Sequence, residues 1–160
     1  MNDSTPETVR AGRILVVDDE KLMSDLTVSM LTAAGYDCRD AGSGLEALAF
    51  LESGEQFDLI LSDFMMPDLD GIGLMERTKE EYSDIPVVIV TAVHDISVAL
   101  SAIRHGVYDY LLKPCEREQL LDAVSRALES RRLKLEQRAY VSGLEAQIVT
   151  LKQQLSGRES

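Results

Sequence analysis

Short apolar segments alternate with helical segments along most of this chain, and this alternation limits the folds that it can adopt. Most of the apolar segments are rich in β-branched residues and show no polar alternation, which is typical of strands buried on both faces. Strands are predicted at residues 14–17, 36–41, 59–62, 85–92 and 107–113. Helices are predicted at residues 20–34, 43–53, 71–82, 95–106 and 115–130.

Strict alternation of strands and helices with short connections predicts an α/β fold, in which helices cover both faces of a parallel sheet. The segment at residues 36–41 is less apolar than the other strands, so we expect it near an edge of the sheet. Sites in such sheets lie at the carboxyl ends of the strands, where the strand order reverses. The residues that follow each strand are therefore the first candidates for function.

The charge of the chain is unevenly distributed. Its 160 residues suit one domain with an additional segment. Residues 1–115 carry a formal net charge of −13 and residues 116–160 carry +1, within a total of −12. The strong negative charge of the protein disfavours non-specific binding to nucleic-acid phosphate backbones, so we expect no direct nucleic-acid partner.

Residues 1–11 are polar and lack the pattern of a secretory signal. They are predicted to be a flexible lead-in.

The cysteine content and the hydropathy of the sequence indicate the cellular compartment in which the protein resides. Cys38 and Cys115 are the two cysteines, and they form no CxxC motif. This is too few for a disulfide framework or a zinc site, so a reducing cytosol fits. No apolar run approaches the ~20 residues of a membrane span. We expect a cytoplasmic protein without a membrane partner.

Acidic, hydroxyl and ammonium groups follow four of the predicted strands. Because parallel strands present their carboxyl ends at one edge of the sheet, these groups are expected to meet there. They are Asp18 and Asp19, followed by Glu20, after the first strand; Asp63 after the third; Thr91 in the fourth; and Lys113 at the end of the fifth.

Such a set of groups suits phosphoryl transfer. Carboxylates that converge repel one another, so they take up protons or require a cation. Without histidine or cysteine, the cluster favours a hard ion, Mg²⁺ before Zn²⁺. A metal ion and an ammonium group would both face phosphoryl oxygens, and phosphoryl transfer needs mainly this positioning and charge stabilisation. An aspartate carboxylate can accept the group.

Each of these residues also has an ordinary structural interpretation when it is taken alone. The Asp18–Asp19 pair could cap a helix, Thr91 is a common strand residue, and Lys113 could belong to a loop. Asp68 and Asp70, which precede Gly71, are interpreted as turn residues. The functional interpretation depends on four strand ends supplying these groups together.

Four sequence motifs resemble those of the receiver domain of two-component response regulators. They are "ILVVDDE" at 14–20, "LILSDFMMPDLDG" at 59–71, "VIVTA" at 88–92 and "YDYLLKP" at 108–114. The resemblance covers residues 12–130. It implies the flavodoxin-like, doubly wound fold, with five parallel strands in the order 2-1-3-4-5 and five helices.

The resemblance also implies a role for particular residues. Asp63 would be the phosphoacceptor. Mg²⁺, or Mn²⁺, would be held by Asp18, Asp19 and Asp63 together with the backbone carbonyl of Met65. Lys113 would contact the phosphoryl group.

A conformational switch is implied as well. Thr91 would contact the phosphoryl group and move toward it, and Tyr110 would repack inward, which changes the surface formed by residues 95–130.

The phosphoryl donor implied by the resemblance would be a sensor histidine kinase or a phosphotransfer protein. The domain would catalyse only its own phosphorylation and dephosphorylation, so it is not a classical enzyme.

Residues 131–160 are predicted to be a helical tail. Leucines recur every seven residues up to residue 135, and a second heptad pattern, offset by one residue, begins at residue 141. Because Ser142 and Gly143 follow the offset, we predict two helical segments or a helix with a disturbed middle. The tail would be a coiled-coil linker or would form a homodimer; alternatively, it is a solvated tail that leans on the domain.

Three functional classes remain at this point. The first is a receiver domain, which is either a stand-alone receiver with a dimerisation tail or the N-terminal regulatory part of a larger protein with an effector domain. A Mg²⁺-dependent aspartyl phosphatase is a second class, but it would usually carry an acid where Met65 stands. A non-catalytic flavodoxin-like domain is a third, and it would need a glycine-rich phosphate loop that the sequence lacks.

Overall fold

The protein folds around a parallel five-stranded sheet. The computed structural model describes residues 12–159, so the predicted lead-in at residues 1–11 lies outside the described residues. The strand order is β2-β1-β3-β4-β5, which confirms the predicted order and the edge position of the second strand. The strands are β1 (Arg13–Val17), β2 (Asp37–Ala41), β3 (Leu59–Ser62), β4 (Val87–Thr91) and β5 (Asp109–Leu112).

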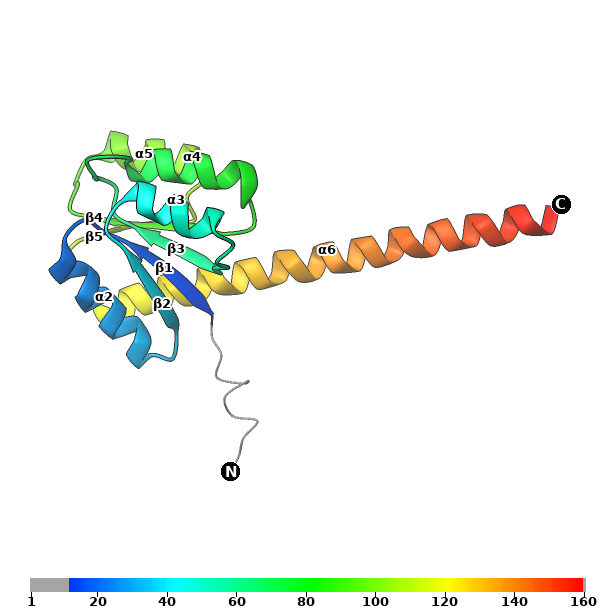
Figure 1. Cartoon of the computed structure of the whole chain (residues 1–160), viewed down its shortest axis with the longest axis horizontal. Coiled ribbons are helices and arrows are strands. Elements are labelled where there is room, and N and C mark those ends of the chain that lie inside the picture. Colours follow the sequence, from blue (N-terminus) through cyan, green and yellow to red (C-terminus); the bar gives the residue numbers. More distant parts are fainter. Residues whose placement is uncertain (1–11, 160) are drawn as a thin grey trace, which may run out of the picture.

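Helices cover both faces of this sheet, as predicted. One group of helices lies on one face of the sheet and a second group lies on the other (Figure 1). The first group contains α3 (Gly44–Glu52), α4 (Gly71–Glu81) and α5 (Ile96–Arg104), and the second contains α2 (Lys21–Ala33) and α6 (Arg117–Glu159).

Two apolar layers hold the helices to the sheet. Successive strand residues point to opposite faces, so Leu15 packs on the side of α3, α4 and α5, while Ile14 and Val16 pack on the side of α2 and α6. Because both faces are buried, the strands need continuous apolar runs rather than alternating ones. All three of these side chains are at most 2% exposed.

The ends of the helices follow the expected local chemistry. The side chain of Asp95 accepts a hydrogen bond from the Ser97 backbone N–H and thereby caps α5. Gly35, which follows α2, has a φ of 101°, a conformation that favours glycine. These caps set where each connection turns, and therefore where the residues that follow each strand are placed.

Helix α6 differs from its prediction. It is one continuous helix of 43 residues, so the prediction of a break or disturbance near Ser142–Gly143 was wrong. Glycine inside a helix costs only about 1 kcal/mol relative to alanine, and the good helix formers on both sides offset that cost. The first part of α6 packs on the sheet through Leu120 and Val124, and the rest extends away from the domain (Figure 1). Within residues 12–159, no helix has both the length and the apolar character that crossing a membrane requires.

Candidate functional site

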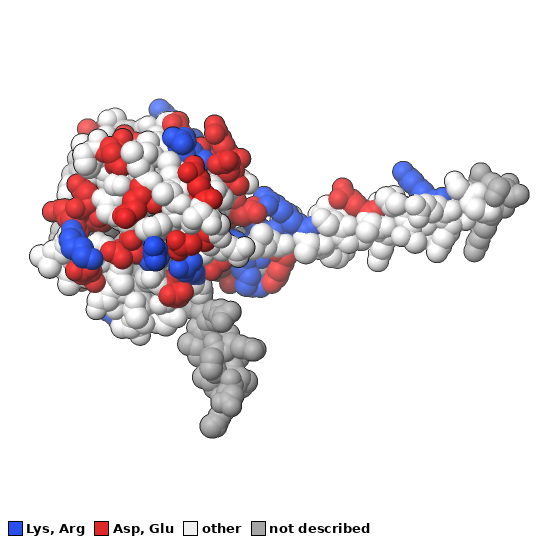
Figure 2. Space-filling model, in the orientation of Figure 1, with Lys and Arg blue, Asp and Glu red and all other residues white. Residues whose placement is uncertain are grey.

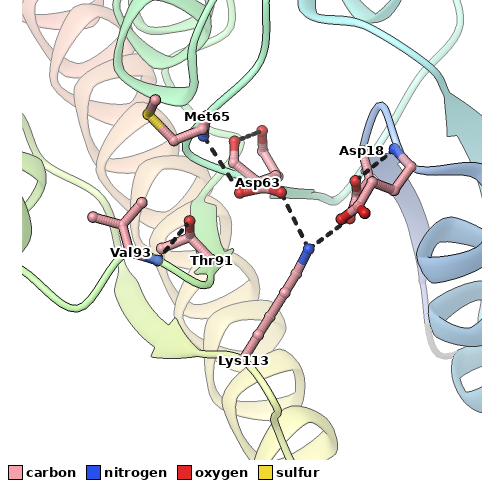
Figure 3. Close-up of polar contacts among 8 residues, drawn as sticks. Asp18, Asp63, Met65, Thr91, Val93 and Lys113 are labelled. Carbon is pink, nitrogen blue, oxygen red and sulfur yellow. Dashed lines mark hydrogen bonds and ion pairs between the residues drawn. The ribbon is translucent and has the colours of Figure 1, made fainter.

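The carboxyl ends of the central strands meet at one edge of the sheet, as the sequence predicted (Figure 3). Asp63 follows β3 directly, and its backbone N–H donates to the carbonyl of Val17, at the end of β1, at 2.9 Å. Lys113 follows β5, and its N–H donates to the carbonyl of Thr91, at the end of β4, at 2.8 Å. The ladder between strands thus fixes the starting point of each functional side chain.

Lys113 joins two of the predicted carboxylates. Its Nζ lies 2.9 Å from Oδ2 of Asp18 and 3.1 Å from Oδ2 of Asp63 (Figure 3). All three side chains are largely buried, with exposed fractions of 14%, 9% and 10% for Lys113, Asp18 and Asp63. One ammonium group therefore faces two carboxylates in a partly dehydrated site, where a second cation would be favoured.

The pKa of Lys113 reflects this environment. Burial lowers the pKa of the ammonium group, but its hydrogen bonds to Asp18 and Asp63 and their charges outweigh that effect. The net result is a pKa above the ordinary value of 10.5. Lys113 is therefore charged at neutral pH and can pair with anionic oxygens.

The third carboxylate beside Asp18 and Asp63 comes from Glu20. Oxygen atoms of Asp18, Glu20 and Asp63 lie within 4.8 Å of one another, so these residues could hold a metal ion. The Glu20 N–H donates to Oδ1 of Asp18 at 2.9 Å, which fixes the turn after β1. Asp19, which the sequence analysis placed among the metal ligands, is exposed and is not part of this cluster. An all-oxygen donor set of this kind fits a hard divalent cation such as Mg²⁺.

The loop after the predicted acceptor, residues 64–70, is termed the acceptor loop. The Met65 N–H donates to Oδ1 of Asp63 at 3.3 Å, and the Met65 side chain is 60% exposed. Gly71 closes the loop, because its N–H donates to the carbonyl of Phe64 at 2.8 Å. A Cβ on Gly71 would lie only 2.9 Å from the carbonyl oxygen of Asp63, so a side chain there would displace the acceptor.

The predicted switch residues both bond to Val93. Thr91 is 1% exposed, and its hydroxyl oxygen accepts from the Val93 N–H at 3.3 Å. The Tyr110 hydroxyl donates to the Val93 carbonyl at 3.1 Å. Burial raises the pKa of Tyr110, and the charges of Asp95 and Asp63 raise it further, so this hydroxyl stays protonated at neutral pH.

An apolar recess of about 240 Å³ leads to the site between α2 and the segment after β5. Met23 and Leu26 of α2 line it on one side, Cys115 lines it on the other, and Asp63 and Lys113 lie within it. Burial raises the pKa of the Cys115 thiol, and nearby acidic residues add to this effect, so the thiol is neutral at neutral pH. The recess therefore places apolar side chains beside Asp63 and Lys113.

Comparison with known proteins agrees with this geometry. The family model of the response regulator receiver domain matches residues 14–125, which is most of the chain. The chain belongs to this family. It is thus a receiver domain of two-component response regulators, and phosphorylation and Mg²⁺ binding are typical of that family.

Curated relatives of this receiver domain include much longer proteins. The DNA-binding transcriptional regulator NtrC of Proteus hauseri is 37% identical over 120 residues, which cover 75% of this chain and 25% of that protein. The C4-dicarboxylate transport transcriptional regulatory protein DctD of Rhizobium meliloti is 33% identical over 136 residues, which cover 85% of this chain and 29% of that protein. The chain spans about a quarter of the length of these relatives.

Solved structures with similar folds include both isolated receivers and longer chains. A response regulator receiver domain protein from Clostridium thermocellum aligns with a TM-score of 0.71 and 30% identity, covering 76% of this chain and 97% of that one. NtrX from Brucella abortus aligns with a TM-score of 0.74 and 36% identity, covering 79% of this chain and 29% of that one. The signal receiver domain of an HD domain-containing protein from Pseudomonas fluorescens Pf-5 aligns with a TM-score of 0.71 and 29% identity, covering 75% and 96% of the two chains.

Proposed function

We propose that this receiver accepts a phosphoryl group on Asp63 from a histidine kinase or a phosphotransfer protein, in a Mg²⁺-dependent reaction in the cytoplasm. The observation that supports this most strongly is the placement of Lys113, whose ammonium bridges carboxylates that come from two different strands. A third carboxylate lies beside them, so the site combines an acceptor, a cation and ligands for a second cation.

In the proposed reaction, an oxygen of Asp63 attacks the phosphorus atom of a phosphohistidine. The new bond joins that oxygen to phosphorus while the phosphorus–nitrogen bond breaks, and the imidazole leaves with the electron pair. Lys113 would turn from Asp63 toward the phosphoryl oxygens, and the Thr91 hydroxyl would donate to another of them. Mg²⁺, held by Asp18, Asp63, the Met65 carbonyl and either Glu20 or Asp19, would neutralise the developing charge.

Mg²⁺ is expected to stabilise the folded domain. The ion relieves repulsion among the carboxylates and binds the folded state only, so the free energy of unfolding should rise by about 2.7 kcal/mol at 100 times the dissociation constant. Thermal unfolding with and without millimolar Mg²⁺ measures this effect. Asp18→Asn is the matched control, because it removes the negative charge of one proposed ligand and should reduce the increase. An unchanged melting temperature in the wild type would contradict the proposed metal site.

An aspartyl phosphatase is less well supported by the same residues. The position two residues after Asp63 is Met65, whose exposed apolar side chain cannot protonate a leaving group. The Asp63 site opens onto an apolar recess rather than a polar substrate pocket. These features favour a site that receives a phosphoryl group from a protein donor.

We infer that residues 12–130 form the receiver and that residues 131–160 form a tail that joins it to an effector domain in a longer chain. This inference is supported by the relatives, whose lengths greatly exceed the matched region.

The hydrogen bonds that join Thr91 and Tyr110 through Val93 support a proposed switch, because movement of Thr91 would disturb the Tyr110 contact. The surface that responds would include α5 and the start of α6.

The exposed half of α6 supports a proposed homodimer. An apolar seam repeats with alternating steps of three and four residues, and each member is between 41% and 57% exposed. Its members are Val141, Leu144, Ile148, Leu151 and Leu155. Two of the three residues at the first seam position, Val141 and Ile148, are β-branched, and both residues at the second position are leucine. This pattern favours a parallel, two-stranded coiled coil. The partner proposed for this seam is therefore a second copy of the same helix.

Ile148→Lys is expected to convert the proposed dimer into a monomer, because it would bury a charge in the seam. Val149→Lys is the matched control, since Val149 is 54% exposed and lies off the seam. Light scattering coupled to size-exclusion chromatography should detect a dimer for the wild type and for Val149→Lys only. A monomeric wild type at high protein concentration, with and without phosphorylation, would refute the homodimer.

A further inference from the structure

The β2–α3 connection is taken as residues 41–45, from the last residue of β2 to the second residue of α3. It contributes no proposed ligand but contacts both sides of the site. At its start, the carbonyl of Ala41 accepts a hydrogen bond from the Asp18 N–H at 3.1 Å. At its end, the Leu45 N–H donates to Oδ2 of Asp68, in the acceptor loop, at 3.1 Å. This short connection thus links the acidic turn after β1 to the loop that follows Asp63.

Asp68 is the only described side chain that bonds the first turn of α3 from the acceptor loop. Two further bonds at this helix start are local, since the Ser43 hydroxyl accepts from the Glu46 N–H and Glu46 accepts from the Gly42 N–H. The Ser43 side chain also bonds to Asp68. Asp68 also accepts from the Leu69 N–H at 2.7 Å, so its carboxylate bridges two segments. The slight burial of Asp68 raises its pKa, but the hydrogen bonds from Leu45 and Leu69 outweigh this and lower it overall.

Close backbone packing reinforces this bridge. A Cβ on Gly44 would lie 2.6 Å from the carbonyl oxygen of Leu69 and 2.9 Å from its Cβ. Real Cβ atoms do not approach backbone this closely, so the acceptor loop can rest on α3 only because residue 44 is glycine. The far side of the loop is therefore held by α3, and its base is closed by the bond between Gly71 and Phe64.

The position of Met65 depends on both of these supports. Its N–H donates to Asp63, and its carbonyl is the proposed metal ligand on the loop. Met66 is 8% exposed and packs in the core, so it also anchors the loop. If the contact with α3 were lost, the segment at Asp68 would lose its bond to the β2–α3 connection, and Met65, which is 60% exposed, would sample more positions. Groups that orient metal ligands typically alter metal affinity 10–100-fold when they are mutated.

We infer that Asp68 is a positioning residue, which, together with Gly44, sets the distance between the acceptor loop and the acidic turn after β1. It acts through the backbone of the β2–α3 connection and touches neither the metal nor the phosphoryl group. This inference rests on the proposed phosphorylation of Asp63. It assigns a role to an aspartate that the sequence analysis interpreted as a simple turn residue.

The test compares Asp68→Ala and Asp68→Asn with the wild type. Isothermal titration calorimetry measures the Mg²⁺ dissociation constant, and intact-mass spectrometry measures the initial rate of labelling by a small acyl phosphate. For Asp68→Ala, we expect Mg²⁺ affinity and labelling rate each to fall by about 10-fold. Asp68→Asn keeps an oxygen that can accept from Leu45, so it should recover most of both losses.

Asp58→Ala controls for a purely structural effect. Asp58 also accepts a backbone hydrogen bond, from the Arg13 N–H at 2.8 Å, and it pairs with Arg131, but it lies at the opposite end of β3 from Asp63. This control should lower the urea midpoint of unfolding while leaving Mg²⁺ affinity within about twofold of the wild type. Gly44→Ala is a second probe, and it should weaken Mg²⁺ binding in the same direction as Asp68→Ala.

Two failures are distinguishable. If the wild type itself shows neither labelling nor Mg²⁺ binding, the proposed function fails. If the wild type shows both, and Asp68→Ala keeps Mg²⁺ affinity and labelling rate within about twofold, the positioning role is overturned. Equal losses of Mg²⁺ affinity in Asp68→Ala and Asp58→Ala would also overturn it, because they would indicate a general loss of structure.

Discussion

Replacing Asp63 with asparagine is expected to abolish phosphoryl incorporation. The amide keeps the size of the side chain but cannot supply the anionic oxygen that attacks phosphorus. Among residues 12–159, no other carboxylate contacts both Lys113 and the Met65 N–H. Intact-mass spectrometry after incubation with Mg²⁺ and a small acyl phosphate should detect one added phosphoryl group on the wild type and none on Asp63→Asn.

Asp70→Asn is the matched control for this substitution. It makes the same chemical change seven residues away, where the side chain caps α4 by accepting from the Gly73 N–H at 2.8 Å. Asparagine caps helices as well as aspartate does, so the fold and the labelling should persist. Equal labelling of Asp63→Asn and the wild type would reject Asp63 as the acceptor.

Replacing Lys113 with methionine is expected to slow labelling by about 100-fold, since a buried donor that stabilises transition-state charge is typically worth that much. The same change should strengthen Mg²⁺ binding, because the ammonium contacts the Asp18 and Asp63 oxygens that would otherwise face the ion. Without Mg²⁺, the variant should be less stable by roughly 1–3 kcal/mol, because two largely buried carboxylates lose their partner. Single-turnover labelling, calorimetry and urea unfolding measure these three effects.

Lys79→Met provides the control for the loss of a lysine. The Lys79 ammonium donates to the backbone carbonyl of His105 at 3.3 Å, and it has no contact with the carboxylate cluster. Labelling and Mg²⁺ affinity should therefore stay at wild-type values. A Lys113→Met variant that labels at the wild-type rate would show that the ammonium does not assist transfer.

Much of the site could be predicted because strand ends in a parallel sheet share one edge. The positions of Asp63 after β3 and Lys113 after β5 depend only on where each apolar run stops, and the ladder bonds of Asp63 and Lys113 bear this out. In this fold, the position at which each apolar strand ends in the sequence therefore indicates which residues lie in the site, because the carboxyl ends of the strands are adjacent in the sheet.

The position of Glu20 beside Asp18 and Asp63 could not be predicted in the same way. Which acid of the run Asp18, Asp19 and Glu20 faces Asp63 depends on the backbone of the turn after β1, and that turn is set by the bond between the Glu20 N–H and Asp18. A count of acids along the sequence does not contain this information. The presence of a third acid directly after the pair was the available signal.

The long helix and the role of Asp68 were missed for different physical reasons. The break was predicted from Ser142 and Gly143, but α6 continues through both residues. Their free-energy cost to a helix is small when strong helix formers flank them. Asp68 bonds a backbone N–H 23 residues earlier in the chain, and only the packing of the acceptor loop against Gly44 creates that contact. Contacts between distant segments leave little trace in the pattern of a single sequence.

The most direct test of phosphorylation at Asp63 is chemical identification of the modified residue in the wild-type protein. Borohydride reduces an aspartyl phosphate to homoserine, which peptide mass spectrometry can locate after labelling in the presence of Mg²⁺. We expect homoserine at position 63 and aspartate retained at positions 18, 19, 68 and 70. Homoserine at any of those four positions, or labelled protein that borohydride leaves unchanged, would show that Asp63 is not the acceptor.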